Sequence, residues 1–323
     1  MKSFTIWANP FLSASAKQLL IRSGAPHTLV LAESSEHVLD VGKLDERLLQ
    51  AEVVFGQPDP GAIIQSEKLR WLHISSAGYT RYDTPGFWAA LKKRNALVTN
   101  SSSVYDAPCA EHIMAFMLAD ARQLYPSYAN QRETSGWPQN ALRQNTHLLA
   151  NQRMLIAGYG AIGRRLSELL APYPVTVIGY RRTPRPGSRV REIGPGELTA
   201  SLNEADHVVN TLPDNDETRH FFDADRLRQI KPGARYYSIG RGTTTEQHAL
   251  IESLETGHLA AAYLDVTDPE PLPPNHPLWS TKNCYITPHT GGGHRNEFER
   301  IVEHFIENLR RFESQKDLVD RLA

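Results

Sequence analysis

The sequence predicts an α/β protein made of two domains, each built on a doubly wound parallel sheet. Short apolar, β-branched segments alternate with longer segments of helical periodicity, and this alternation is typical of parallel sheets covered by helices. The length of 323 residues is about twice that of a typical domain. We therefore expect two units, each with a core of its own.

The expected strands fall into two groups along the chain. The first group is expected at residues 4–8, 29–31, 53–55, 71–74 and 97–99, and one small sheet accounts for it. The second group is expected at residues 154–157, 175–178, 207–212, 234–239, 261–264 and 285–287. These six strands suit a doubly wound sheet.

Three further segments complete the expected organisation. A helix is expected over residues 107–124, where apolar residues crowd the middle. The polar stretch 125–147 is expected to be an irregular connection. Near the end of the chain, Phe298, Ile301, Phe305 and Leu309 recur at helical spacing, which predicts a helix that packs into a core.

The composition excludes several function classes. Lys and Arg total 35 against 36 Asp and Glu, and a net charge of -1 offers no basic field for nucleic acid. No apolar run approaches the roughly 18 residues of a membrane span, and the N-terminus lacks the pattern of a secretory signal. Cys109 and Cys284 stand far apart, without a CxxC motif or a Cys/His ligand cluster. We therefore expect a cytoplasmic protein with no metal, nucleic-acid or membrane partner.

A glycine-rich turn stands between the first strand of the second group and a helix-forming segment. It reads Gly158, Tyr159, Gly160, Ala161, Ile162, Gly163. The order of strand, glycine turn and helix lets the backbone approach a pyrophosphate at the positive end of the helix. A purely structural glycine turn is the alternative, and the flanking strand and helix favour the dinucleotide site.

The next strand ends without the acid that would hold the ribose hydroxyls of NAD. Arg181, Arg182 and Thr183 follow it, and residues 171–191 contain no carboxylate. Guanidinium groups pair with a 2′-phosphate, which an acid would repel. NADP is therefore the expected cofactor, with NAD as the second candidate, whereas a solvated surface loop is the alternative interpretation.

Polar side chains also follow three later strands of the second group. Arg241 lies between two glycines after one strand, Asp265 closes the next with Glu270 beyond it, and His289 follows the last. The carboxyl ends of the strands in an open α/β sheet meet at one edge, where ligands bind. Residues distant in sequence are thus expected to converge there, although a lone histidine is more often a loop or cap residue.

Together these residues resemble the D-isomer-specific 2-hydroxyacid dehydrogenases, especially their glyoxylate/hydroxypyruvate reductase branch. The matching motifs span nearly the whole chain, at residues 76–79, 110–112, 158–163, 239–242, 264–266, 270–273 and 287–289. The resemblance implies two Rossmann-like or flavodoxin-like domains with an interdomain cleft. It assigns residues 1–100 plus 291–323 to a substrate-binding domain and residues 101–290 to an NAD(P)-binding domain.

The resemblance also implies a reaction, the reduction of a small 2-keto acid to the D-2-hydroxy acid by hydride transfer. Arg241 would bind the substrate carboxylate and polarise the keto oxygen, with a planar fork that suits both groups. His289 would be the acid/base and Glu270 its partner, because a neighbouring carboxylate favours the charged imidazole.

Other site residues follow from the same resemblance. Ala77, Gly78 and Tyr79 would hold the substrate carboxylate, together with Arg241 and His289. Asp265 would lie near the nicotinamide carboxamide. Further cofactor contacts are expected at the glycine turn, at residues 181–183, and at Leu212, Pro213 and Ile239.

The sequence departs from the family pattern in one turn. Thr243, Thr244, Thr245 and Glu246 follow Gly242 where the family has Val-Val-Asp, and Thr245 or Glu246 is expected to begin a helix. Members of the family are usually dimers, so a homodimer is expected, with helix 107–124 as its contact surface. Two alternatives stay open: a non-catalytic NAD(P)-sensing, corepressor-like protein, and a formate- or phosphite-type dehydrogenase on the same fold.

Overall fold

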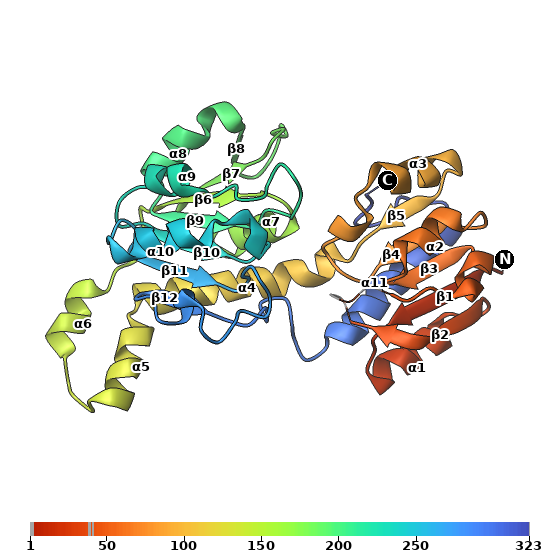
Figure 1. Ribbon diagram of the computed structural model, residues 1–323, viewed down its shortest axis with the longest axis horizontal. Helices are drawn as coiled ribbons and strands as arrows, with labels where there is room; N and C mark the ends of the chain where they lie inside the picture. Colours follow the sequence, from red (N-terminus) through yellow and green to blue (C-terminus); the bar gives the residue numbers. More distant parts are fainter. Residues whose placement is uncertain (1–2, 38–39, 41, 323) are drawn as a thin grey trace. The chain divides into compact units, whose positions relative to one another are not determined.

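A computed structural model describes residues 3–37, 40 and 42–322 (Figure 1). The chain divides into two compact units, the first formed by Met1–Tyr105 with Gly293–Ala323 and the second by Asp106–Gly292. Each unit contains one parallel sheet, and the predicted α/β class with two sheets is thereby confirmed. In the described part of the chain, helices are too short or too polar to cross a lipid bilayer.

The sheet of the first unit has five parallel strands in the order β2-β1-β3-β4-β5. This is the flavodoxin-like order. The strands are β1 (Thr5–Pro10), β2 (Thr28–Glu36), β3 (Val53–Gly56), β4 (Trp71–Ile74) and β5 (Leu97–Thr99). Every strand of the first predicted group is therefore present, and β2 extends beyond its predicted end.

Local sequence fixes where the helices of this unit begin. In α1 (Ala14–Ser23) the N-cap Ser13 accepts a hydrogen bond from Ala16 N. In α2 (Pro60–Gln65) and α3 (Pro85–Lys93) a proline occupies the first helical turn, and Asp59 and Thr84 are the caps. Each cap satisfies an amide that has no partner inside its own helix.

The C-terminal helix α11 (Glu297–Glu313) completes the core of the first unit. Phe305 stacks on Phe55 of β3 with ring centroids 4.2 Å apart, and it also stacks on Trp71 of β4 at 5.2 Å. Figure 1 shows this blue helix against strands from the red and orange start of the chain. The predicted C-terminal core helix is confirmed, since Ile301 and Leu309 are also buried.

The sheet of the second unit has seven parallel strands in the order β12-β11-β10-β9-β6-β7-β8. The order reverses between β6 and β9, as in dinucleotide-binding folds. The strands are β6 (Arg153–Ala157), β7 (Thr176–Tyr180), β8 (Arg191–Ile193), β9 (His207–Asn210), β10 (Arg235–Ser238), β11 (Ala261–Leu264) and β12 (Cys284–Ile286). Six strands were expected, and β8 is the addition. It escapes prediction because a three-residue edge strand with two charged residues has no apolar pattern.

The helices of the second unit correct one prediction. They are α4 (Ser102–Ala121, which begins in the first unit), α5 (Leu124–Glu133), α6 (Gln139–Asn145), α7 (Ala161–Leu169), α8 (Leu198–Glu204), α9 (Ala224–Gln229) and α10 (Gln247–Glu255). The irregular connection expected over 125–147 is wrong, because α5 and α6 occupy most of it. Neither helix buries a residue, so neither carries the apolar periodicity that sequence analysis detects.

A buried histidine begins β9. The His207 side chain is fully buried, and its Nδ1 hydrogen-bonds with the Tyr237 hydroxyl at 3.1 Å. Its Nε2 pairs with the Gln152 side-chain oxygen. Burial, aided by the nearby Arg235 charge, lowers the pKa of His207 from 6.5 to about 4. The folded protein therefore keeps this imidazole neutral where the unfolded chain takes up a proton.

This neutrality predicts a loss of stability in mild acid. As the pH falls from 6.5 toward 4, the unfolded chain binds a proton at His207 that the folded chain does not, and unfolding is favoured. Between about pH 6.5 and about pH 5 the loss is about 2 kcal/mol. Denaturant unfolding at about pH 7 and about pH 5 should show a smaller acid effect in His207→Gln than in the wild type. The exposed His248→Gln is the control, and an equal acid effect in His207→Gln and wild type would contradict the prediction.

Candidate functional site

The glycine turn joins β6 to α7 in the second unit. Gly158 has a φ of 85°, and a Cβ there would lie 3.0 Å from the backbone of Thr211 and Leu212. The amides of Gly158 and Tyr159 both donate to the carbonyl of Tyr180, at 3.1 Å each. The turn is therefore fixed between the ends of β7 and β9, and only glycine suits its first position.

The first turn of α7 contains backbone donors without a protein acceptor. The hydrogen bonds of this helix begin with Arg164 N to Gly160 O at 3.0 Å. Within the described residues, the amides of Ala161, Ile162 and Gly163 precede that bond without an acceptor, and no side chain caps the helix. No acidic residue lies in the first turn. This donor set fits the pyrophosphate of a dinucleotide.

Tyr159 takes part in this turn only through its backbone. Its side chain is 1% exposed, and its hydroxyl hydrogen-bonds with Ser167 at 2.8 Å. The ring packs on Gly179 and Gly163, where a Cβ would come within 2.5 Å and 3.0 Å of it. The tyrosine thus anchors the glycine turn onto the sheet, and any cofactor contact at this position belongs to its main chain.

The predicted phosphate-binding arginines follow β7 directly. Arg181 comes after Tyr180, the residue that accepts the bonds of the glycine turn. Burial lowers the pKa of Arg181, and the nearby charges of Arg185 and Arg164 lower it further. Arg164 of α7 is a member of this cluster that sequence reasoning missed. Three guanidinium groups near one another favour an anion.

Acids nevertheless reach this cluster from elsewhere in the chain. Glu192 of β8 lies 4.0 Å from Arg181 Nε, and Glu217 forms an ion pair with Arg182. Both acids stand outside residues 171–191, the segment in which the sequence showed no carboxylate. The charge of the arginines is therefore partly compensated, a feature that only the fold reveals.

The end of β9 packs against the end of β10. Asn210 accepts a hydrogen bond from Leu212 N at 3.1 Å, and its amide donates to Thr244 Oγ1 at 2.7 Å. The Pro213 carbonyl accepts from the Thr218 hydroxyl at 2.6 Å. A Cβ at Gly240 would overlap the Leu212 backbone. Leu212, Pro213 and the loop that carries Arg241 are thus held together, and the fully buried Asn210 gave no sequence signal for this role.

His289 and Glu270 form the centre of the candidate active site. The His289 Nδ1 lies 2.8 Å from Glu270 Oε2, and Glu270 Oε1 accepts a bond from Thr267 N at 2.9 Å. Burial alone would raise the pKa of Glu270. The hydrogen bonds from His289 and Thr267, with the charges of His289 and Arg241, hold that pKa below its usual value. Glu270 is therefore an ionised partner for the imidazole.

Arg241 belongs to the same cluster. Its charge acts on Glu270, and its Nη1 donates to the Gly240 carbonyl at 2.7 Å. A Cβ at Gly242 would overlap the carbonyl of Thr267, so the loops after β10 and β11 touch through backbone atoms. The structure thereby brings together the three predicted catalytic residues from three separate loops. Glu246 caps α10 through His248 N and Ala249 N, which confirms the predicted helix start.

Asp265 holds the loop that carries His289. Its side chain is 2% exposed, and its two oxygens accept from Thr290 N and Gly291 N, each at 2.9 Å. The Thr287 hydroxyl donates to the same carboxylate at 2.6 Å, and His112 of α4 contacts this hydroxyl at 3.0 Å. Burial lowers the pKa of His112. The family resemblance implies a cofactor contact for Asp265, and the structure shows that its carboxylate fixes the loop after β12.

The predicted substrate turn lies in the first unit, after β4. The carbonyls of Ser76, Ala77 and Gly78 accept from Ser101 N at 3.0 Å, Asn100 Nδ2 at 2.6 Å and Ser76 Oγ at 2.6 Å, respectively. In the described part of the chain, the amides of Ala77, Gly78 and Tyr79 donate to no protein group. We name residues 76–79 the amide turn. It offers backbone donors of the kind that bind an anion.

Comparisons with known proteins are consistent with this geometry. A family profile described as D-isomer specific 2-hydroxyacid dehydrogenase, NAD binding domain, matches residues 114–291. A glyoxylate reductase from Aeropyrum pernix is 31% identical over 280 residues, covering 81% of this chain and 80% of that protein. A glyoxylate/hydroxypyruvate reductase B from Serratia proteamaculans is 30% identical over 274 residues, covering 83% and 82%.

A solved structure has the same architecture over the full length. It is a D-isomer specific 2-hydroxyacid dehydrogenase family protein from Aeromonas salmonicida, with a TM-score of 0.75 and 26% identity, and the match covers 100% of this chain and 99% of that one. The resemblance and the prediction of an NAD(P)-dependent oxidoreductase are thereby confirmed. The chain belongs to the D-isomer specific 2-hydroxyacid dehydrogenase family.

Proposed function

We propose that this protein reduces a small 2-keto acid, of the glyoxylate or hydroxypyruvate type, to the D-2-hydroxy acid with NADPH. One observation carries the proposal: His289 bonds Glu270 at 2.8 Å while the charge of Arg241 acts on the same carboxylate. An acid/base, its ionised partner and a planar cation thus occupy one site. The relatives from Aeropyrum pernix and Serratia proteamaculans, by their names, support this substrate class.

The reduction needs a proton donor at the keto oxygen. The bound nicotinamide would supply a hydride to the carbonyl carbon, which leaves negative charge on that oxygen. His289 Nε2 donates the proton there, while Glu270 accepts from Nδ1 and stabilises the imidazolium before the transfer. The loop bonds of Asp265 keep this imidazole oriented.

Two groups of donors serve the rest of the substrate. The Arg241 fork pairs with the substrate carboxylate and keto oxygen, and its charge stabilises the developing oxyanion. The free amides of the amide turn bind the carboxylate, which makes the first unit the substrate-binding domain and the second the NAD(P)-binding domain. A non-catalytic NAD(P)-sensing protein needs no proton donor, so the paired imidazole and carboxylate favour an enzyme.

The first test combines a substrate panel with a His289 variant. Wild-type protein with NADPH is expected to turn over glyoxylate, hydroxypyruvate or a related 2-keto acid, followed by nicotinamide absorbance. His289→Asn should lower kcat by about 10² to 10⁴, because it removes the proton donor. The exposed His248→Asn on α10 is the matched control and should keep wild-type kcat.

Two outcomes would contradict this proposal. No turnover of any 2-keto acid, with NADPH still bound, would favour the sensor. A His289→Asn variant that keeps kcat within about threefold of the wild type would remove His289 from the proton transfer.

The preference for NADP rests on the arginines after β7. Arg181 and its neighbours Arg185 and Arg164 gather beside the glycine turn, where the ribose of a dinucleotide would lie. A 2′-phosphate there would relieve the mutual repulsion of these cations. Glu192 offsets one of these charges and leaves a net positive cluster.

Arg181→Asp tests this preference. It should raise the KM for NADPH about tenfold or more and leave the KM for NADH within about threefold, because the new acid repels only the extra phosphate. Arg191→Asp makes the same charge change on β8, where Arg191 pairs with Glu197, and serves as the control. Equal KM values for NADPH in Arg181→Asp and wild type would refute the phosphate site.

The homodimer is proposed through α5 and α6. In the expected contact helix, α4, the apolar Ile113, Phe116 and Met117 are already buried within the chain, and the two helices that follow it add exposed surface to this region. Trp137 is 90% exposed beside α6, and it lines a hollow of about 620 Å³ between the two helices. Short helices without buried residues gain little stability alone, so a second copy is the partner that would cover them.

Sedimentation of a Trp137 variant tests the dimer. The wild type is expected to sediment as a dimer, and Trp137→Asp should shift it toward monomer, because a charge would be buried at the contact. Leu44→Asp changes another exposed apolar residue, which lies in the first unit, and should leave the dimer intact. A monomeric wild type would contradict the proposal, as would a Trp137→Asp protein that dimerises as tightly.

A further inference from the structure

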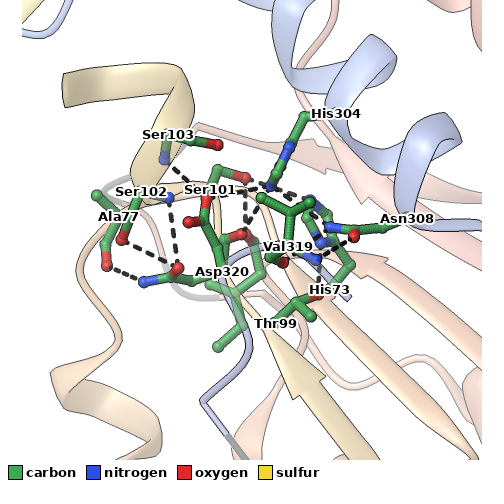
Figure 2. A network of polar contacts seen from close by, with 12 residues as sticks. His73, Ala77, Thr99, Ser101, Ser102, Ser103, His304, Asn308, Val319 and Asp320 are labelled. Atoms are coloured by element: carbon green, nitrogen blue, oxygen red, sulfur yellow. Dashed lines mark hydrogen bonds and ion pairs between the residues drawn. The ribbon is translucent and has the colours of Figure 1, made fainter. Parts of the chain in front are cut away.

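Asn100 is a buried residue that connects three parts of the first unit. It follows β5 and is 3% exposed. Its Nδ2 donates to the Ala77 carbonyl at 2.6 Å, and its Oδ1 accepts from Ser102 Oγ at 3.0 Å. Its main-chain N donates to Asp320 O at 3.1 Å, and its carbonyl pairs with His304 Nε2 at 3.2 Å. Figure 2 shows this network.

We infer that Asn100 is a positioning residue for substrate binding, because its side chain holds a carbonyl of the amide turn and leaves the amides of the turn available to the substrate. The inference rests on the proposed function, in which this turn binds the substrate carboxylate. Asn100 touches no reacting atom itself. It acts through Ala77, whose carbonyl it holds at 2.6 Å.

Only a side-chain amide of this length meets both demands on Asn100. One end must donate to a carbonyl while the other end accepts from a hydroxyl. Ser102 Oγ and Ser102 N both face Oδ1, which fixes the orientation of the amide. An aspartate would place a carboxylate oxygen against the Ala77 carbonyl and repel it. The turn would then lose its anchor without any loss of side-chain volume.

The backbone of Asn100 is itself held in place, because its N donates to Asp320 and its carbonyl pairs with His304. The His304 side chain pairs with Asp320 at 3.3 Å, and Asp320 also accepts from Ser103 N at 2.7 Å. Asn308 fastens the same C-terminal segment through Val319, with bonds of 2.8 Å and 3.1 Å. Figure 2 shows Asp320 bonded to Ser103 at the start of α4, and Asn308 bonded to Val319.

A second anchor holds the other half of the amide turn. The Gln57 amide donates to Ser76 Oγ at 3.0 Å, and Ser76 in turn donates to the Gly78 carbonyl. The Ser76 carbonyl accepts a hydrogen bond from Ser101 N. All three carbonyls are thus bonded to protein, whereas the amides of Ala77, Gly78 and Tyr79 lack protein acceptors in the described part of the chain. Donors fixed before the substrate arrives bind an anion without a cost of reordering.

The experiment compares two asparagines whose side-chain amides make the same two kinds of hydrogen bond. Asn100→Asp should raise the KM for the 2-keto acid about tenfold or more, with kcat within about threefold, because the turn grips the substrate carboxylate equally in the ground and transition states. The KM for NADPH should not change. Asn130→Asp makes the same chemical change in the second unit, where Asn130 donates to the Gly136 carbonyl and accepts from the Thr134 hydroxyl. Its KM for the 2-keto acid should stay at the wild-type value.

Folding is checked by circular dichroism and the melting temperature of each variant. Asn100→Ala removes the donor without adding a charge, and it replaces Asn100→Asp if that variant does not fold. A folded variant at position 100 with the wild-type KM for the 2-keto acid would overturn the inference and leave the proposed function intact. So would an equal rise in KM in Asn130→Asp, because the effect would then not depend on the amide turn.

A binding measurement separates failure of the inference from failure of the proposed function. Oxamate, a planar carboxylate that resembles a 2-keto acid, is titrated calorimetrically into protein with NADP. If the wild type turns over no 2-keto acid, the proposed function fails, and oxamate still decides the role of Asn100. Binding about tenfold weaker in the Asn100 variant supports the inference. Equal affinity, or no oxamate binding by the wild type, refutes it.

Discussion

The structure of the site depends on carboxylates that hold backbone amides. Asp265 accepts from two amides of the loop after β12, and Glu270 accepts from Thr267 N as well as from His289. Asp265 is 2% exposed, and its several donors offset the cost of burying its charge. Asp265 thereby holds the backbone that follows His289, and Glu270 holds the Nδ1 side of its imidazole. The geometry of His289 is therefore a property of the loops rather than of one side chain.

Close backbone contacts make this arrangement specific. The loops after β9, β10 and β11 meet where Gly240 faces Leu212 and Gly242 faces Thr267. A side chain at either glycine would push two loops apart and move Arg241 away from Glu270. The amide turn of the first unit follows the same principle with neutral groups, since side-chain amides and a hydroxyl replace the carboxylates. In both units the binding groups are set in place by hydrogen bonds made before any ligand arrives.

The sequence predicted most of the fold and the residues that gather at the candidate site, for identifiable reasons. The strands are short apolar runs, and Arg241, Glu270 and His289 each follow such a run at the functional edge. By contrast, β8, α5 and α6 have no apolar periodicity, so pattern analysis passed over them. The pairing of Glu192 with Arg181 depends on a strand neighbour, and Asn100 reaches Ala77 across 23 positions. Such contacts come from tertiary packing, which no local pattern encodes.

The position of α11 has a consequence for how the chain acquires its structure during synthesis. The aromatic ring at position 305 completes the core of the first unit, yet it leaves the ribosome after the whole second unit. Until α11 is synthesised, Phe55 of β3 and Trp71 of β4 therefore lack the aromatic ring that covers them, while the second unit can already fold. The nascent first unit is therefore the part of the protein with exposed aromatic surface during synthesis, and truncation just before α11 would leave this surface exposed permanently.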